Sequence, residues 1–356
     1  MKILFLNTNI GYGGASKMMV WVANKLAESN FDITFITYRS DERFQTLSTK
    51  IKYKHLSLEP IDGKGKNIFH TIKTLHNLIK REKFDLAVGF LTPSQLRLSL
   101  ACIGLRTKLL FSHRGDPYQK AKCLSAKISD LAFKSADYYV FQTEKAKLYF
   151  SNKIRNKAAI IANPINKIER TCLRESHVEK RIVCVGRLDI NQKRQDLLIA
   201  AFNLISEKFP EYILEFFGDG PDTENLKIMA SKNTKIFFRG KTTDVAKSIQ
   251  NAALFVLSSD YEGIPNALLE AMALGMPCIS TDCSPGGAAM LIKNNINGML
   301  VERNNVNALA DSISYMLMHR DKAEDMGKEA MLVSTTFSED IIASKWIELF
   351  NKIGES

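Results

Sequence analysis

Short apolar runs alternate with longer amphipathic stretches along almost the whole chain. In the first half, the apolar runs predict strands at residues 2–8, 32–38, 84–91, 107–113, 137–143 and 158–163. Between them, apolar residues recur at helical spacing in residues 15–29, 65–83, 94–104, 119–135 and 143–152. Strands that alternate with helices in this way predict a parallel sheet with helices on its faces.

The second half repeats this alternation. Its apolar runs predict strands at 181–188, 212–220, 235–240, 253–259, 277–282 and 298–301. Helical spacing appears at 195–208, 222–232, 243–251, 267–274 and 286–293, and again near the C-terminus. We therefore predict an α/β protein with two doubly wound Rossmann-like domains that face a central cleft. Ligands are expected at the carboxyl ends of the strands.

Asn163-Pro164 and the polar stretch that follows mark the division between the two domains. The prediction is an N-terminal domain at 1–163, a linker at 164–180 and a C-terminal domain at 181–340. A final helix at about 341–356 is expected to pack back on the first domain.

Composition places the chain among folded soluble proteins, because 45% of its 356 residues are hydrophobic and 24% are charged. Its six cysteines form no Cys-x-x-Cys pair, which favours reduced cytoplasmic thiols over a disulfide or metal framework. No apolar stretch approaches the about 20 residues that span a bilayer. The opening residues "MKILFLNTNIGYGG" are typical of a buried strand rather than a signal peptide.

Charge is unevenly distributed. Residues 1–163 hold 27 Lys and Arg against 12 Asp and Glu, a balance of +15, whereas residues 164–356 hold 22 against 26. An anionic partner of the first half is expected: nucleic acid, anionic lipid or a phosphorylated substrate. Aromatic stacking series and recognisable nucleic-acid modules are missing from the sequence, so nucleic acid is not the expected partner.

A glycine-rich loop, "NIGYGGASK", follows the first predicted strand and opens a helix. Backbone amides at such a helix start can bind an anion. A dinucleotide fingerprint fits poorly, because Ser16 stands where the third glycine belongs and Arg39-Ser40 ends the second strand without an acid. A tight turn without a ligand remains an alternative.

Candidate binding residues follow four predicted strands of the second half. Arg187 and Lys193 are two cations that suit a diphosphate, although a solvated loop is an alternative. A tight turn with accessible backbone is expected at Gly218-Asp219. Arg239-Gly240 follows another predicted strand, where main chain can recognise a base.

The fourth candidate is "EGIPNALLEAMALGMPCISTD", in which Glu262 and Glu270 are eight residues apart. Gly263, Ile264, Pro265 and Asn266 lead into a helix whose first N–H groups can bind a phosphate or sugar oxygen. Glu270 lies among apolar residues, where a carboxylate needs a partner. Ribose hydroxyls or an ion pair would each supply one.

These motifs in this order resemble the retaining glycosyltransferases of family 4, which have the GT-B fold. The resemblance is carried by Glu262-x7-Glu270, "VGRL…QKRQDLLIAAF", "FFGDGPD" and "IANPIN". It covers nearly the whole chain and is strongest in the second half.

The resemblance implies roles for individual residues. Arg187 and Lys193 would hold the donor diphosphate, Glu270 the ribose hydroxyls and Glu262 the transferred sugar. Gly13 and Gly14 would bring backbone near the phosphates and the acceptor. His113 in "LLFSHRGDP" would contact the donor sugar, with Arg114 and Asp116 as further candidates.

The implied enzyme is a retaining glycosyltransferase that moves a hexose or N-acetylhexosamine from a UDP-sugar to a lipid-linked glycan or lipopolysaccharide acceptor. No cofactor or required metal is expected, since no Asp-x-Asp dyad ends a strand in the cleft. The basic first half, notably residues 65–83 and 118–134, suggests a cytoplasmic protein peripheral on the inner face of the cell membrane. A nucleotide-sugar epimerase and a basic polyanion-binding protein without catalysis remain alternatives, as does a non-catalytic nucleotide-sugar sensor.

Overall fold

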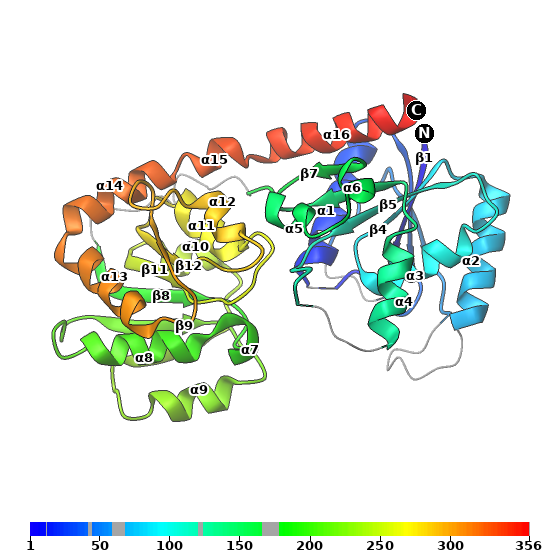
Figure 1. The fold of residues 1–356 in the computed structure, drawn as a ribbon. Coiled ribbons are helices and arrows are strands. Elements are labelled where there is room, and N and C mark those ends of the chain that lie inside the picture. Colours follow the sequence, from blue (N-terminus) through cyan, green and yellow to red (C-terminus); the bar gives the residue numbers. More distant parts are fainter. Residues whose placement is uncertain (12, 42–44, 59–67, 120–123, 166–177, 356) are drawn as a thin grey trace. The chain divides into compact units, whose positions relative to one another are not determined.

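The computed structural model describes residues 1–11, 13–41, 45–58, 68–119, 124–165 and 178–355 (Figure 1). It forms two compact units. Unit 1 comprises Met1–Ala162 together with Asp340–Ser356, and unit 2 comprises Asn163–Glu339. The sequence put these divisions at residues 163 and 340, and most of its predicted linker, residues 166–177, lies outside the described residues.

Unit 1 is built on a seven-stranded parallel sheet of order β3-β2-β1-β4-β5-β6-β7. Its strands are β1 (Lys2–Asn7), β2 (Asp32–Thr37), β3 (Lys52–His55), β4 (Leu86–Gly89), β5 (Lys108–His113), β6 (Tyr138–Phe141) and β7 (Ala158–Ile160). Edge strand β3 was missed by the sequence analysis. Its residues "KYKH" include no apolar run, because an edge strand can carry lysines that face water.

The helices of unit 1 are α1 (Gly14–Glu28), α2 (Ile68–Glu82), α3 (Thr92–Ala101), α4 (Leu124–Phe133), α5 (Glu144–Leu148) and α6 (Asn152–Arg155). The single helix predicted at 143–152 is therefore wrong. Ser151 has extended backbone and begins α6 as its N-cap, which separates α6 from α5.

Helix α16 (Glu339–Glu355) completes the core of unit 1 from the far end of the chain. The Phe350 ring stacks on Phe5 of β1 with centroids 6.5 Å apart, and Trp346 stacks on Phe90 at 5.7 Å. Both α16 side chains are fully buried. Figure 1 shows α16, in red, beside β1 and the chain start.

Unit 2 has a six-stranded parallel sheet of order β10-β9-β8-β11-β12-β13. Its strands are β8 (Glu179–Val185), β9 (Ile213–Phe217), β10 (Ile236–Gly240), β11 (Ala252–Leu257), β12 (Cys278–Thr281) and β13 (Met299–Val301). The predicted linker was too long by two residues, because β8 already begins at Glu179.

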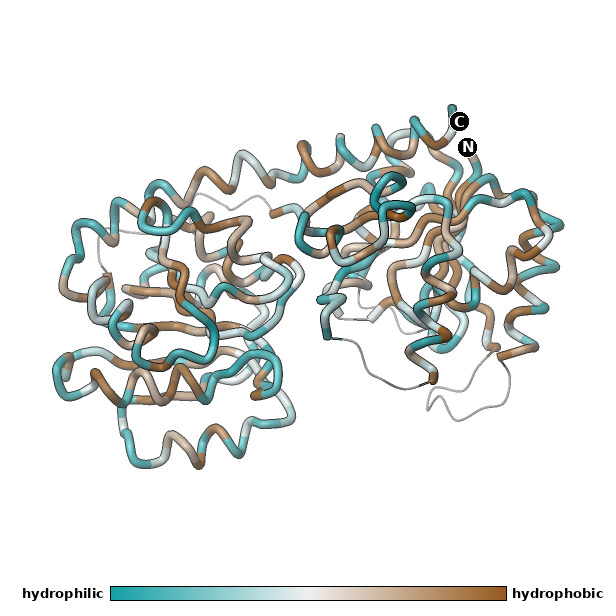
Figure 2. Tube along the Cα trace, in the orientation of Figure 1, coloured by the Kyte–Doolittle hydropathy of each residue, from teal (hydrophilic) through white to brown (hydrophobic). Residues whose placement is uncertain are grey.

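The helices of unit 2 are α7 (Ile190–Lys193), α8 (Gln195–Ile205), α9 (Thr223–Ala230), α10 (Val245–Ile249), α11 (Asn266–Ala273), α12 (Gly287–Leu291), α13 (Val306–Met318), α14 (Arg320–Ala330) and α15 (Val333–Thr336). The strands of both sheets are largely brown in Figure 2, whereas teal residues are frequent in the helices and loops. Each unit thus buries its own apolar core.

Candidate functional site

The carboxyl ends of the strands of unit 2 bring the predicted donor-binding residues to one edge of the sheet. Arg187 follows β8, Asp219 follows β9, and the segment with Glu262 follows β11. Because all these strands are parallel, their carboxyl ends share this edge, which is where α/β sheets bind ligands.

Lys193 and Glu262 are joined directly in this structure. Lys193 ends α7, and its Nζ forms an ion pair and hydrogen bond with Glu262 Oε1. Ser259 Oγ donates to the same oxygen at 3.1 Å. The two charged side chains are only 18% and 11% exposed, so water screens their attraction weakly. From the sequence, Lys193 and Glu262 were expected to have separate roles, and their pairing was not predicted.

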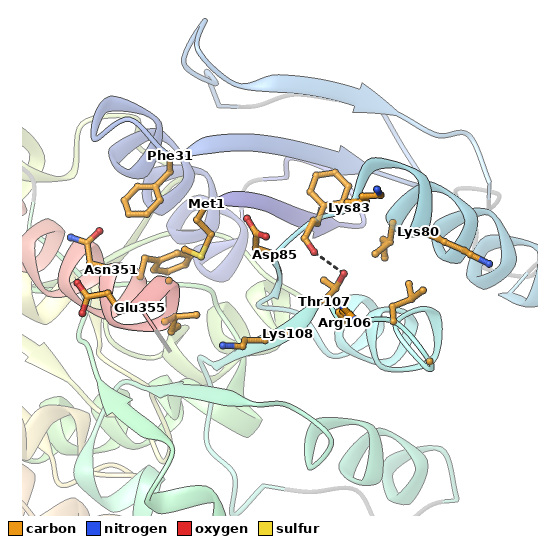
Figure 3. A pocket seen from close by; sticks show the side chains of 17 residues that line it. Met1, Phe31, Lys80, Lys83, Asp85, Arg106, Thr107, Lys108, Asn351 and Glu355 are labelled. Atoms are coloured by element: carbon orange, nitrogen blue, oxygen red, sulfur yellow. Dashed lines mark hydrogen bonds between the residues drawn. The ribbon is translucent and has the colours of Figure 1, made fainter.

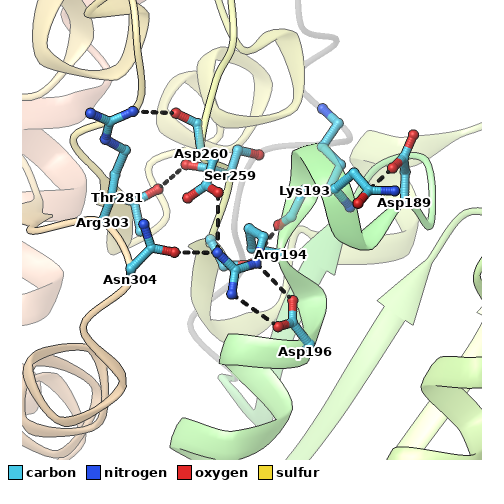
Figure 4. Close-up of polar contacts among 11 residues, drawn as sticks. Asp189, Lys193, Arg194, Asp196, Ser259, Asp260, Thr281, Arg303 and Asn304 are labelled. Carbon is cyan, nitrogen blue, oxygen red and sulfur yellow. Dashed lines mark hydrogen bonds and ion pairs between the residues drawn. The ribbon is translucent and has the colours of Figure 1, made fainter. Parts of the chain in front are cut away.

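A second group of polar contacts fixes the backbone around this pair (Figure 4). Arg194 donates from Nη1 to Asp260 at 3.1 Å and makes two 3.1 Å contacts with the Asp196 carboxylate. Those hydrogen bonds, first to Asp196, raise the pKa of Arg194. Ser258 Oγ donates to the Lys193 carbonyl at 2.8 Å. The loop before α8 is thus tied to the loop after β11. The sequence analysis missed Arg194, although it stands inside the quoted "QKRQD".

Glu270 lies on the less buried side of α11. Its helix neighbours Leu268, Leu269, Ala271 and Met272 are buried, whereas Glu270 is half-buried and Asn266, four residues earlier, is exposed. Residues four apart share a helix face. Glu270 is thus only partly buried among the apolar residues of α11, and its contact with ribose hydroxyls stays a prediction.

Backbone packing against Gly287 fixes the loop that leads into α11. A Cβ atom at Gly287 would lie 1.6 Å from the carbonyl oxygen of Gly263. Pro265 is the N-cap of α11, and Ile264 is buried. Glu262 donates its backbone N–H to the Ser284 carbonyl at 2.7 Å. Residues 284–287, at the beginning of α12, therefore hold residues 262–266 in place through this close approach and this hydrogen bond.

Replacing Gly287 with alanine is expected to lower the free energy of unfolding by about 3 kcal/mol, because the new methyl group collides with backbone that cannot move aside cheaply. Chemical denaturation followed by circular dichroism measures this change. Gly115→Ala is the matched control, since a Cβ there meets nothing within 4 Å. Equal stability of the two variants would contradict the proposed tight approach.

Arg187 is the most accessible of the predicted cations. Its side chain is 64% exposed and lies 3.8 Å from the Asp189 carboxylate, while its carbonyl accepts a 2.8 Å hydrogen bond from Gln195. The backbone at the end of β8 is therefore fixed, and the guanidinium remains open to a ligand.

Two further predicted residues make contacts within the protein. Asp219 accepts hydrogen bonds from the Thr223 hydroxyl at 3.0 Å and the Gly220 amide at 2.8 Å, and these lower the pKa of Asp219. Arg239 contacts Glu215, a carboxylate that is only 3% exposed and also binds Arg181. The Arg239 side chain therefore serves a structural ion-pair group, and Arg239 and Gly240 belong to β10 rather than following it.

Gly218 brings the β9 and β8 ends into contact. A Cβ atom there would lie 1.9 Å from the Gly186 carbonyl oxygen, and its amide donates to the Gly240 carbonyl at 2.8 Å. A side chain is thus excluded at this position, as the predicted tight turn requires.

In unit 1, Gly13 is the N-cap of α1 and Gly14 is its first residue. Neither position has another heavy atom within 4 Å of an added Cβ, so the backbone is accessible. Buried Asn7 donates to the Ser16 hydroxyl at 3.0 Å and thereby joins the end of β1 to α1. Tyr12 lies outside the described residues.

His113 ends β5 beside a cavity of about 330 Å³ within unit 1. Its ring meets Phe133 edge-on at 5.8 Å and Phe150 at 5.9 Å. Asp116 also lines the cavity. Polar residues that the sequence analysis missed complete the wall: Gln95, Gln119, Ser125, Ser129 and Asp130. The cavity pairs aromatic rings with hydroxyl, amide and carboxylate groups, which can hydrogen-bond a polar ligand.

Arg114 lies beside this cavity but does not line it. Its Nη1 approaches the Ile161 carbonyl at 3.3 Å, and its guanidinium lies 5.7 Å from the centre of the Phe90 ring. Burial lowers the pKa of Arg114 to about 9. The contacts favour a structural role, with the side chain joining β5 to the end of β7.

A larger cavity of about 960 Å³ opens at the other edge of the unit 1 sheet (Figure 3). It is lined by the residues before β4 and β5 and by the end of α16, with Lys80, Lys83, Arg106 and Lys108 around Met1, Phe31 and Phe350. Since ligands of such sheets bind at the carboxyl edge, this cavity is not the candidate active site.

Within the described part of the chain, no group of three or more His, Cys, Asp or Glu side chains is arranged to hold a metal ion. Independence from metal remains a prediction. Cys102, Cys184, Cys278 and Cys283 are buried free thiols. Burial raises the pKa of Cys184 to about 12, so this thiol near Lys193 stays protonated.

Comparison with known proteins fits the arrangement of unit 2. Residues 179–319 match the family model described as "Glycosyl transferases group 1". These residues form a glycosyl transferases group 1 domain. The group 1 domain contains the predicted donor-binding residues of unit 2, from Arg187 to Glu270.

Similarity extends beyond the group 1 domain. An uncharacterised glycosyltransferase of Haemophilus influenzae is 28% identical over 97% of this chain and 98% of its own. A Campylobacter jejuni α-1,4-N-acetyl-D-galactosaminyltransferase acting on a diphospho-undecaprenol-linked glycan is 25% identical over 99% of both chains. Together with the group 1 domain, these relatives support a glycosyltransferase.

The fold has close counterparts among solved structures. Anabaena HepE in complex with UDP superposes with a TM-score of 0.80 at 18% identity, covering 99% of this chain and 100% of that one. At this identity the likeness shows the fold, which is the predicted GT-B fold of two parallel-sheet Rossmann-like domains.

Proposed function

We propose that the protein is a retaining glycosyltransferase that moves a hexose or N-acetylhexosamine from a UDP-sugar to a lipid-linked glycan or lipopolysaccharide acceptor in surface-polysaccharide biosynthesis. The observation that carries the proposal is the Lys193–Glu262 pair beside exposed Arg187 at the carboxyl edge of the unit 2 sheet. UDP in the HepE complex and the diphospho-undecaprenol acceptor of the Campylobacter relative support the choice of donor and acceptor.

The proposed reaction depends on stabilising a leaving diphosphate. Lys193 and Arg187 would neutralise the charge that develops as the glycosidic bond breaks, and backbone N–H groups at the start of α11 would donate to the same oxygens. Lys193 would exchange its contact with Glu262 for the diphosphate. Glu262, released from its partner, would accept hydrogen bonds from the hydroxyls of the transferred sugar.

In this proposal Glu270 binds the ribose diol and no divalent metal is required. Two cations and a helix start would replace the metal as a source of positive charge. Gly13 and Gly14 would offer accessible backbone to the acceptor or phosphates. The sugar enters with the anomeric configuration that it keeps in the product.

A donor screen tests the reaction directly. Purified protein with a panel of UDP- and GDP-sugars and a lipid-linked acceptor is expected to release UDP from at least one UDP-sugar, with an α-linked product by nuclear magnetic resonance. Release that persists with EDTA would support metal independence. Interconversion of the UDP-sugar without an acceptor would instead establish an epimerase. No turnover of any donor would overturn the proposal, and tight binding of polyanions would then favour a non-catalytic protein.

We also propose that the protein is peripheral on the inner face of the cell membrane. No helix in the described part of the chain is long and apolar enough to cross a bilayer. A lipid-linked acceptor would bring the enzyme to a membrane surface, and the +15 balance of residues 1–163 would favour an anionic one.

A further inference from the structure

Helix α4 buries Ala132 and Phe133 near its end but leaves a second apolar face exposed. Leu124, Ile128 and Leu131 are 73%, 48% and 72% exposed, and their spacing of four and three residues places them on one face. The opposite face, with Ser125, Ser129 and Asp130, lines the 330 Å³ cavity beside His113. We refer to Leu124, Ile128 and Leu131 as the α4 stripe.

The basic helix α2 shows the usual arrangement and makes the contrast clear. Its Leu75, Leu78 and Ile79 are buried, while Lys73 and Lys80 face outward. The sequence analysis treated residues 65–83 and 118–134 alike. The structure separates them, because Leu75, Leu78 and Ile79 of α2 are buried inside unit 1, although Phe69 is exposed, whereas all three residues of the α4 stripe are exposed among the residues that the structure describes.

Tyr118, before α4, and Tyr149, the C-cap of α5, are exposed amphipathic side chains near the same cavity. Tyr118 and Tyr149 are 53% and 39% exposed and meet edge-on at 4.9 Å. Tyr118 also donates its hydroxyl hydrogen to the Lys145 carbonyl at 3.4 Å. Phe150, next to Tyr149, lines the cavity with α4. Tyrosine and lysine side chains suit the boundary between water and lipid, because each has an apolar part that can contact lipid and a polar end that can stay hydrated.

We propose that the α4 stripe inserts into the apolar layer of an anionic lipid leaflet. Lys127, which is exposed beside the stripe, and Lys145 would lie at the headgroups. We expect the stripe to bind a lipid surface rather than a groove on another protein. The stripe is narrow, lysines lie beside it, and residues 1–163 have a net charge of +15. The biological role of this lipid contact rests on the proposed membrane association. Lipid binding itself can be measured without turnover.

The first test compares two double variants by cosedimentation with vesicles of phosphatidylglycerol and phosphatidylcholine. Leu124→Ser/Leu131→Ser is expected to weaken binding at least about tenfold, because two inserted side chains are lost. Leu204→Ser/Ile228→Ser is the matched control: these side chains are 62% and 71% exposed on helices of unit 2, and their loss should leave binding unchanged. Equal binding by both variants would overturn the proposal.

Lipid charge and salt concentration show whether the protein binds through anionic lipid. Wild-type protein should bind anionic vesicles at low salt and bind phosphatidylcholine vesicles more weakly. No binding to anionic vesicles at low salt overturns the proposal. A second outcome also overturns the proposal. If the wild-type protein is a dimer in solution, and the stripe variant is a monomer that binds vesicles as well as wild type, then the α4 stripe contacts a second copy of the chain rather than lipid.

A spectroscopic readout checks insertion itself. The Ile128→Trp variant is expected to show a blue-shifted emission with vesicles and quenching by lipids brominated on the acyl chain. Emission that lipids leave unchanged contradicts insertion. The stripe variant should keep its turnover with a water-soluble acceptor, so loss of lipid binding and failure of the proposed reaction give different results.

Discussion

Replacing Lys193 with alanine is expected to lower turnover with a UDP-sugar and acceptor at least about a hundredfold, while the protein stays folded. The change removes a cation proposed to meet the leaving diphosphate. It also leaves Glu262, whose side chain is 11% exposed, with Ser259 as its described side-chain partner. Initial rates of UDP release at saturating donor measure the loss.

Two controls separate these effects. Lys232→Ala removes an exposed lysine of the same unit and should leave turnover unchanged. The Lys193→Ala change leaves the largely buried Glu262 carboxylate without its cationic partner, which can lower the melting temperature. In that case the double variant Lys193→Ala/Glu262→Gln should regain the melting temperature but not the turnover. Near wild-type turnover in Lys193→Ala would contradict the assignment of Lys193 to the donor site.

Glu270→Ala is expected to cause a comparable loss of turnover, at least about a hundredfold, by removing the acceptor of the ribose hydroxyls. The half-buried position of Glu270 on α11 predicts that the helix survives, because Leu268, Leu269 and Met272 supply most of its buried apolar surface. Steady-state rates together with thermal melts measure both parts of this expectation. Glu329→Ala, at an exposed position on α14, is the matched control and should have no effect.

A deoxyribose donor can distinguish ribose binding from a general disturbance of the site. Wild-type enzyme should lose activity when the donor nucleotide lacks a ribose hydroxyl, whereas Glu270→Ala should show little further loss. Equal additional losses in the two proteins would mean that Glu270 does not contact that hydroxyl. A fully active Glu270→Ala enzyme would exclude the proposed role altogether.

Much of the fold could be predicted because buried parallel strands are continuous apolar runs. The run "ALFVLSS" predicted a strand at 253–259, and β11 occupies Ala252–Leu257. Strand β3 could not be found in this way, because its lysines, tyrosine and histidine stabilise an edge through pairing with β2 rather than through apolar burial. Helix boundaries failed where one capping residue, Ser151, outweighed the local helical pattern.

The candidate site was predictable at the level of strand ends but not of side-chain pairs. The order of motifs brought Arg187, Lys193 and Glu262 to one sheet edge, yet nothing in the sequence shows that Lys193 contacts Glu262 across 69 residues of chain. Arg239 illustrates the same limit. Its expected place after a strand suggested a ligand, whereas the structure places it within β10 and its guanidinium contacts buried Glu215 of β9. Side-chain partners depend on distances between strands that local sequence does not encode.

The return of α16 to unit 1 has a consequence for the order of synthesis. N-terminal domains usually fold first as the chain leaves the ribosome. Here unit 1 still lacks Trp346 and Phe350 when every residue of unit 2 has been made. Nascent unit 1 would therefore expose the surfaces of Phe5 and Phe90 that these rings cover. Unit 2 is then expected to finish folding before unit 1, whose apolar surface would stay exposed until the last helix is made.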